Sequence, residues 1–126
     1  MAAENYFEAV WHTVPEFEGL SSVNTTRLGC GFDFRLCRQE AEQDFLAVEV
    51  KGLAQRFGGL SLTTKEHSEA GRLADRYFLF VVRNFAEEPN HLIYRNPLYC
   101  GLNFARKERA IVQVSWQTNI LNNSSQ

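Results

Sequence analysis

The chain has 126 residues, 44% of them hydrophobic and 13% aromatic, with a formal net charge of −2 at pH 7. This length fits one domain with one buried core, so we expect a single domain over residues 1–126 and exclude an intrinsically disordered chain. The acidic balance excludes a protein that binds phosphate backbones through a large basic excess, because such binding is driven by positive charge.

No stretch reaches the roughly 20 apolar residues of a membrane-spanning helix, and the N-terminus lacks the pattern of a secretory signal. We therefore expect a cytoplasmic protein with no membrane partner. The three cysteines, Cys30, Cys37 and Cys100, match neither a disulfide framework, which needs an even number, nor the close pairing of a zinc site. We expect all three to be reduced.

The first part of the chain predicts a helix followed by a weak strand. Apolar residues recur at helical spacing over residues 3–13, which predicts an amphipathic helix that ends before Pro15. Residues 20–25 can form a short strand, although their polar content makes the pattern weak.

The next two segments predict an antiparallel hairpin. Residues 32–37 alternate between apolar and polar side chains, which places Phe32, Phe34 and Leu36 on one face of a strand. A polar turn leads to residues 45–51, which have the composition of a second strand. The short connection favours pairing of the two strands side by side.

A second helix and a buried strand follow. Residues 60–62 can pair briefly, and Thr63 and Glu66 then have the spacing of a capping box at the start of a helix that runs to about residue 74. Residues 77–82 form a continuous apolar run, which is typical of a strand covered on both faces.

The C-terminal part predicts accessory strands within about residues 90–118. The patterns favour residues 91–94 and 110–116, with a frayed tail at 122–126. The order is therefore helix, two or three strands, helix, strand and an accessory pair. This order predicts an α/β (α+β) fold, with a mixed central sheet that carries a helix on each face.

The residues with chemical potential lie on the predicted hairpin. Glu49 and Lys51 are two residues apart on one strand, so their side chains project from the same face. This spacing alone occurs by chance in many proteins, where it is a solvated pair of charges. The hairpin, however, brings Asp33 at the start of one strand beside the end of the other.

Two carboxylates with a lysine form a recognisable chemical device. Mg²⁺ prefers oxygen ligands, which the Asp33 and Glu49 carboxylates and the backbone carbonyl of Val50 can supply. Lys51 can orient or activate the attacking water, or stabilise charge on phosphoryl oxygens. The pattern therefore indicates metal-dependent hydrolysis of phosphodiesters.

Four segments carry a resemblance to a known family: residues 31–34, residues 47–52, residues 62–66 with Ala70, and residues 77–84. Together they resemble the domain of unknown function at the C-terminus of the plant protein NO VEIN, which also occurs in bacterial restriction and defence proteins. The resemblance spans about residues 3–84. It implies the PD-(D/E)xK nuclease superfamily and its restriction-endonuclease-like core of helix, three strands, helix and strand.

The resemblance also implies roles for individual residues. Asp33, Glu49 and Lys51 would be the catalytic residues, with Mg²⁺, for which Mn²⁺ can substitute, held by Asp33, Glu49 and the Val50 carbonyl. Glu4 on the first helix would be an acidic residue beside the metal, and is equally well explained as a surface charge. Phe32 stands where the superfamily's name has proline.

Two residues at the start of the second helix, Glu66 and Thr64, are further secondary candidates for the site. Helix capping alone accounts for Thr63 and Glu66, so a catalytic role for Glu66 is optional. Dispersed histidines and basic side chains identify no nucleic-acid-binding residues.

Several functions remain open from the sequence. The first is a Mg²⁺-dependent endonuclease that cuts DNA, serving as the catalytic module of a larger restriction or defence protein or working as a homodimer. The alternative is a non-catalytic module of the same fold that binds nucleic acid or a partner protein. A third and weaker interpretation is a structural domain that mediates assembly.

Overall fold

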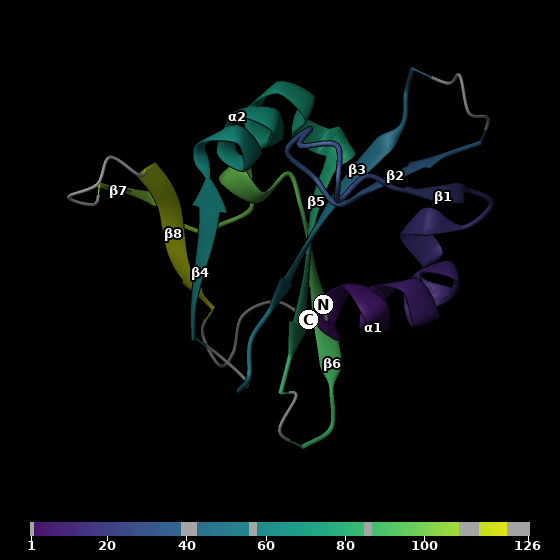
Figure 1. The fold of residues 1–126 in the computed structure, drawn as a ribbon, viewed down its shortest axis with the longest axis horizontal. Helices are drawn as coiled ribbons and strands as arrows, with labels where there is room; N and C mark the ends of the chain where they lie inside the picture. Colours follow the sequence, from purple (N-terminus) through teal and green to yellow (C-terminus); the bar gives the residue numbers. More distant parts are fainter. Residues whose placement is uncertain (1, 39–42, 56–57, 85–86, 109–113, 121–126) are drawn as a thin grey trace.

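The computed structural model describes residues 2–38, 43–55, 58–84, 87–108 and 114–120 (Figure 1). Its α-helices are α1 (Ala2–Val10) and α2 (Thr64–Leu73), accompanied by short 3-10 turns at Trp11–Thr13, Pro15–Phe17, Ala74–Arg76 and Pro97–Tyr99. Its strands are β1 (Ser21–Asn24), β2 (Phe34–Cys37), β3 (Leu46–Gly52), β4 (Gly58–Thr63), β5 (Tyr77–Arg83), β6 (Asn90–Arg95), β7 (Ala105–Glu108) and β8 (Val114–Ile120).

The strands form two sheets. The central sheet has five strands in the order β1-β2-β3-β5-β6, in which β3 and β5 are parallel and the other neighbours are antiparallel. The second sheet has three antiparallel strands in the order β4-β8-β7. The central sheet is mixed, as the sequence predicts, and the parallel step from β3 to β5 passes through β4 and α2.

The two faces of the central sheet are covered differently, and Figure 1 shows α1 on one side with α2 and the three-stranded sheet on the other. On the α1 face, the Phe7 ring packs on Phe34 and Phe80 at centroid distances of 4.5 and 4.9 Å. On the other face, Tyr77 packs beneath α2, and Leu79 packs against the small sheet. All seven residues of β5 are therefore buried, as expected for a strand covered on both faces.

Most of the predicted elements are confirmed, with boundaries moved by a few residues. The hairpin forms as β2 and β3, and the first helix ends before Pro15 through a 3-10 turn. At the start of α2, the Thr63 hydroxyl accepts from the Glu66 N–H, and the Glu66 side chain accepts from the Thr63 N–H, which completes the predicted capping box.

The predicted face of Phe32 is wrong. Strand β2 begins only at Phe34, so Phe32 lies in the turn before it and packs beneath α2 with Ala47 and Tyr77, whereas Phe34 and Leu36 face α1. The alternation of side chains does not extend to Phe32, because this residue precedes the strand and packs against Ala70 and Leu73 of α2.

The C-terminal strands also differ from the prediction. Strand β8 spans Val114–Ile120, so only the end of the predicted strand at 110–116 overlaps it. Residues 109–113 and the tail at 122–126 lie outside the described residues. Strand β7 was not predicted, because its sequence is dominated by charged residues rather than by an alternating pattern.

The cysteines and the two α-helices bear on two further expectations from the sequence. Cys30, Cys37 and Cys100 are all free thiols, as expected from their number and spacing. Within the described part of the chain, neither α-helix has the length and apolar character required to cross a bilayer.

Gly31 fixes the turn that precedes β2 and so places Asp33 just before the first residue of that strand. Its carbonyl oxygen accepts a hydrogen bond of 2.8 Å from the Tyr77 hydroxyl on β5. A Cβ atom at this position would lie 2.6 Å from the Glu69 Cγ and 3.0 Å from the Lys65 carbonyl oxygen, both on α2. Only glycine therefore lets the turn pass this close to the helix.

We predict that Gly31→Ala destabilises the fold more than Gly29→Ala. Both positions have positive φ, 93° and 65°, but nothing lies within 4 Å of a Cβ at Gly29. Backbone strain alone should lower the unfolding free energy of Gly29→Ala by about 1–2 kcal/mol. The added overlap with α2 should bring the loss in Gly31→Ala to about 3 kcal/mol or more, measured by urea unfolding. Equal losses in the two variants would contradict this role of Gly31.

Candidate active site

Asp33 occupies the point at which β2 and β3 separate. Its backbone N–H donates to the Val48 carbonyl at 2.9 Å, and its Oδ2 accepts from the Val50 N–H at 2.9 Å. Asp33 immediately precedes Phe34, the first residue of β2, and its carboxylate takes the place of a backbone carbonyl as the partner of the Val50 N–H. These two hydrogen bonds fix Asp33 against the centre of β3.

Glu49 and Lys51 lie on β3, on either side of Val50, and their side chains point toward α2. Glu49 is 3% exposed, which makes it one of the few buried charged residues in the described structure. The Lys51 Nζ lies 3.2 Å from the Glu49 Oε2 and 2.9 Å from the Glu66 Oε1. The predicted approach of Asp33, Glu49 and Lys51 is therefore present in the structure, and Glu66 joins it.

The Val50 carbonyl faces the same gap in the sheet. Within a strand, the N–H and C=O groups of one residue point to the same side. Since the Val50 N–H donates to Asp33, its carbonyl also points to the edge of β3 that β2 leaves open. The oxygen is thus directed toward Asp33 rather than toward β5.

The secondary candidates differ in their distance from this cluster, which we define as Asp33, Glu49, Lys51 and Glu66. Glu4 on α1 lines the same recess, and its charge contributes to raising the pKa of Asp33. Thr64 is exposed in the first turn of α2 and does not line the recess. The structure thus brings Glu4 and Glu66 to the cluster and leaves Thr64 outside it.

Burial controls the protonation of the two buried acids. It raises the pKa of Asp33 to about 6, against the opposing effect of the Val50 N–H. It raises the pKa of Glu49 well above its usual range, against the opposing charge of Lys51. A hydrogen bond between Glu49 and Glu66 also favours a proton on Glu49, so the metal-free cluster holds a neutral Glu49.

Lys51 and Glu66 remain charged. Burial by itself lowers the pKa of Lys51, but the charges of Glu49 and Glu66 outweigh it, and the pKa is raised. Burial by itself raises the pKa of Glu66, but the Lys51 charge and hydrogen bond, with the Thr63 N–H, lower it. Lys51 is therefore an ammonium group held by an ionised Glu66.

The donor set fits a hard divalent cation. Within the described part of the chain, no three His, Cys, Asp or Glu side chains are arranged as a ready-made metal site. Mg²⁺ does not require one, because it usually retains several waters and takes only one or two carboxylates from the protein. Asp33, Glu49 and the Val50 carbonyl provide oxygen atoms of this kind on one side of a recess.

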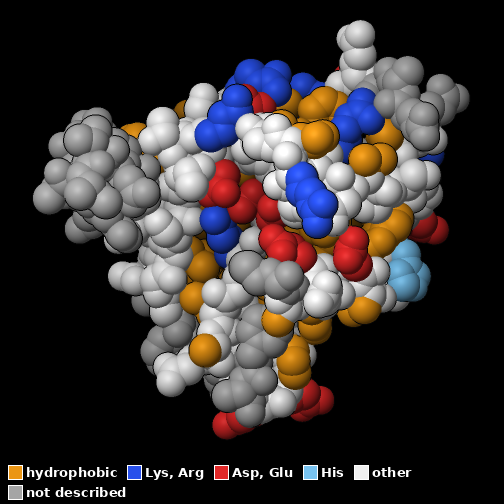
Figure 2. Space-filling model, viewed as in Figure 1, with side chains coloured by type: hydrophobic (Ala, Val, Ile, Leu, Met, Phe, Trp, Pro, Cys, Tyr) orange, Lys and Arg blue, Asp and Glu red, His pale blue; other side chains and the backbone are white. Residues whose placement is uncertain are grey.

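The cluster lies open to solvent between two recesses, and Figure 2 shows acidic side chains gathered in the middle of this face. The cluster recess, of about 430 Å³, is lined by the cluster together with Glu4, Val50, Gly52 and residues 59–61 of β4. The loop recess, of about 180 Å³, is lined by Asp33, Glu49, Glu66, Thr63, Lys65, Thr26 and residues 29–32. The two recesses therefore share the lining residues Asp33, Glu49 and Glu66.

Comparison with known proteins assigns the family. The family described as the C-terminal part of protein NO VEIN matches residues 3–94. The chain belongs to this family. The family match ends at residue 94, within β6, whereas the resemblance in the sequence covers about residues 3–84. No curated protein matches the chain.

The fold of this NO VEIN C-terminal domain is also found in the solved structure of a Holliday junction resolvase. Hjc, a Holliday junction resolvase from the archaeal hyperthermophile Archaeoglobus fulgidus, superimposes with a TM-score of 0.51 at 14% sequence identity. The similarity covers 90% of this chain and 77% of that chain. It supports the predicted restriction-endonuclease-like fold, with its mixed central sheet and a helix on each face.

The sequence pattern understates the role of Glu66 and gives no sign of the position of residues 59–61. Glu66 was fully explained by the capping box, yet the same Oε1 atom accepts from the Thr63 N–H and from Lys51. An acidic residue at the start of the helix after the hairpin is the only signal that pointed to it. Residues 59–61 line the cluster recess, and nothing in their sequence indicates this position.

We predict that Glu49→Gln alters the pH dependence of stability in the metal-free protein. The pKa of Glu49 is raised above its unfolded value of 4.5, so the folded state favours the neutral carboxyl and loses stability as pH rises above that value. The glutamine amide does not ionise. Urea unfolding should therefore show wild type losing stability relative to Glu49→Gln between about pH 5 and about pH 8.

The exposed residue Glu18 provides the matched control. Glu18→Gln makes the same substitution at an exposed position, and should follow the wild-type pH profile. Parallel profiles for wild type and Glu49→Gln would contradict the neutral, buried state of Glu49.

Proposed function

We propose that this domain is a Mg²⁺-dependent endonuclease that hydrolyses phosphodiester bonds in DNA. The observation that carries the proposal is the convergence of Asp33, Glu49 and Lys51 where β2 separates from β3, in a recess open to solvent. The nuclease-like fold supports it, because the cluster then lies on a scaffold that is shared with Hjc, a Holliday junction resolvase. We propose DNA rather than RNA as the substrate.

In this proposal, Asp33, Glu49 and the Val50 carbonyl hold the metal. When bound, Mg²⁺ would polarise the phosphoryl group and neutralise the charge on the leaving oxygen. The Val50 N–H keeps the Asp33 carboxylate in place. Removal of the proton from Glu49 makes the Glu49 carboxylate available to the metal as a second ligand. Both ligands are thus positioned by hydrogen bonds of the chain itself.

Lys51 acts as a hydrogen-bond donor rather than as a base. Its pKa is raised by Glu49 and Glu66, so it stays an ammonium group at neutral pH. Such a group orients the attacking water and stabilises negative charge on the phosphoryl oxygens. Water adds to phosphorus, the bond to one sugar oxygen breaks, and the products are a phosphate monoester and a hydroxyl group.

The overall charge bears on the biological setting. With a net charge of −2, the domain lacks the overall basic excess that drives binding to phosphate backbones. We therefore propose that target selection is provided by other parts of a larger restriction or defence protein, or by pairing of two copies. This domain would then be the catalytic module.

A second candidate is a non-catalytic module of the same fold. It is favoured by the ion pair of Lys51 with Glu66 and the 3.2 Å contact of Lys51 with Glu49, which a purely structural polar cluster would also contain. The two candidates differ in metal binding, since a structural cluster already satisfies its charges and gains nothing from Mg²⁺.

We predict metal-dependent cleavage of plasmid and single-stranded DNA by wild type. Asp33→Asn removes a metal ligand and Lys51→Ala removes the ammonium group, so each should slow cleavage by roughly a hundredfold or more. Asp44→Asn, at an exposed position by the opposite end of the hairpin, is the control and should cut at the wild-type rate. Gel assays with Mg²⁺ and with Mn²⁺ measure these rates. Equal cutting by Asp33→Asn and wild type would contradict the assigned site.

We predict further that metal stabilises wild type and not Glu49→Gln. A ligand that binds only the folded state at about 100 times its Kd adds about 2.7 kcal/mol to the unfolding free energy. Thermal unfolding with Mn²⁺ should therefore raise the Tm of wild type and leave that of Glu49→Gln unchanged, with calorimetry as a direct measure of binding. Folded protein that neither binds metal nor cuts DNA would favour the non-catalytic module.

A further inference from the structure

A third recess opens on the small sheet, next to the cluster recess. We call it the amide recess, and it has a volume of about 460 Å³. This volume is within the range of roughly 300–1,000 Å³ that is common for small-ligand sites. Residues 59–61 of β4 line both this recess and the cluster recess. The two recesses are therefore separated by a single strand.

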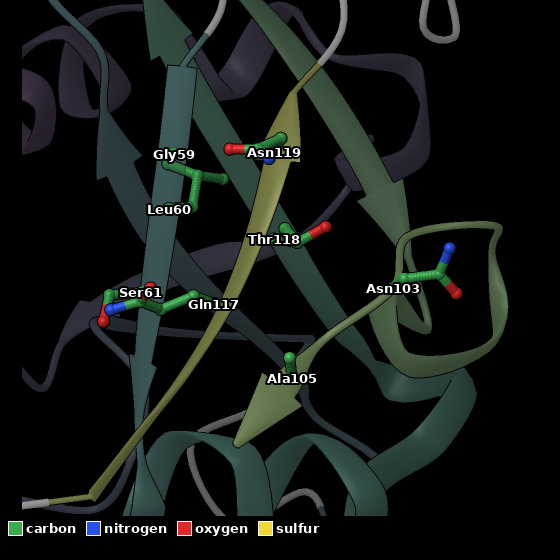
Figure 3. A pocket seen from close by; sticks show the side chains of 8 residues that line it. All are labelled: Gly59, Leu60, Ser61, Asn103, Ala105, Gln117, Thr118 and Asn119. Atoms are coloured by element: carbon green, nitrogen blue, oxygen red, sulfur yellow. The ribbon is translucent and has the colours of Figure 1, made fainter. Parts of the chain in front are cut away.

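The amide recess is built on the outer face of the sheet β4-β8-β7, as Figure 3 shows. The backbone register places Gly59 opposite Asn119, and Gln117 between Ser61 and Ala105. Small residues thus flank two amide side chains, which leaves space above the strands. A third amide, Asn103, comes from the segment before β7.

The lining selects a particular kind of ligand. The residues that line the amide recess include no acidic or basic side chain, so a phosphate group would find no cation there. Among the described residues, the side chains of Asn103 and Asn119 have no hydrogen-bond partner, and that of Gln117 has only Ser115 at 3.4 Å. Each amide has both a donor and an acceptor to offer. A flat, neutral group with donors and acceptors on its edge matches this lining best.

The strand between the recesses presents its backbone to the cluster. The Thr63 N–H donates to Glu66, so at this residue β4 directs its N–H away from β8 and toward the cluster. Hydrogen-bonding direction in an antiparallel pair repeats every two residues, which places the N–H groups of Ser61 and Gly59 on the same free edge. These neutral donors adjoin the cluster on the side of the amide recess.

We propose that the amide recess binds an unpaired nucleobase of the strand whose phosphodiester lies at the cluster. This proposal rests on the proposed function. The strand would cross β4 at residues 59–61, with its backbone along the free edge and one base turned over the small residues. Amide side chains recognise base edges through paired donor and acceptor contacts, of which Asn or Gln with adenine is the best known.

The test compares binding of base-containing and abasic single strands. Fluorescence anisotropy is measured for the full chain with labelled oligodeoxyadenylate, oligodeoxythymidylate and an abasic strand of equal length, with Ca²⁺ in place of Mg²⁺ to avoid turnover. The variants are Asn119→Ala and Asn103→Ala, and the control is Asn5→Ala on the exposed surface of α1. Both recess positions are exposed, so the variants should fold, which thermal unfolding confirms.

Wild type and Asn5→Ala should bind at least one base-containing strand more tightly than the abasic strand. Asn119→Ala and Asn103→Ala should weaken that binding roughly tenfold while leaving abasic binding unchanged. Equal binding of all strands by all variants, in a protein that cuts DNA, would overturn this proposal and leave the nuclease function standing. A wild type that neither binds nor cuts nucleic acid would overturn both.

Discussion

The burial of Glu49 beside Lys51 is the interaction on which the rest of the site depends. A carboxyl group that is 3% exposed carries a high cost as an unpaired anion, so the fold must supply a proton, a cation or both. Lys51 supplies the cation, and the hydrogen bond to Glu66 favours the proton. The same Glu66 caps α2, which ties the start of the helix to the end of β3. The position of α2 and the state of Glu49 are therefore set together.

The topology explains why this cluster forms at one place in the sheet. Strand β3 pairs with β2 only as far as Val48 and with β5 from Ala47 to Gly52. Beyond Val48, the edge of β3 toward β2 is open, and the Asp33 carboxylate occupies it by accepting from Val50. Because β5 is buried on both faces, the cluster is backed by a closely packed strand, while its front opens to two recesses. A packed support with an open front is the arrangement that a ligand-binding site requires.

The sequence predicted those parts of the site that depend on local patterns. The hairpin, the shared face of Glu49 and Lys51 and the approach of Asp33 all follow from strand periodicity and antiparallel pairing. The role of Glu66 beside Lys51 did not follow, because it depends on how the helix packs over the sheet.

The misplacement of Phe32 has a similar cause. Phe32 lies before β2 and packs against Ala70 and Leu73 of α2, a long-range contact that no local pattern reports. Strand β7 is recognisable only through its pairing with β8, since its own residues are mostly charged. Long-range packing thus accounts for each of these errors.

Charge distribution then determines how such a domain can handle a nucleic acid. The cluster recess carries Glu4 together with the cluster acids, so without a metal its field repels a phosphate backbone. In the proposed function, a divalent cation would therefore serve the approach of the substrate as well as its chemistry. The neighbouring amide recess adds no charge, so contacts made there change little with salt, unlike contacts to phosphates. If the domain acts on nucleic acid as proposed, it would gain little affinity from the backbone, so base contacts and partner domains or subunits would be the remaining sources of selectivity.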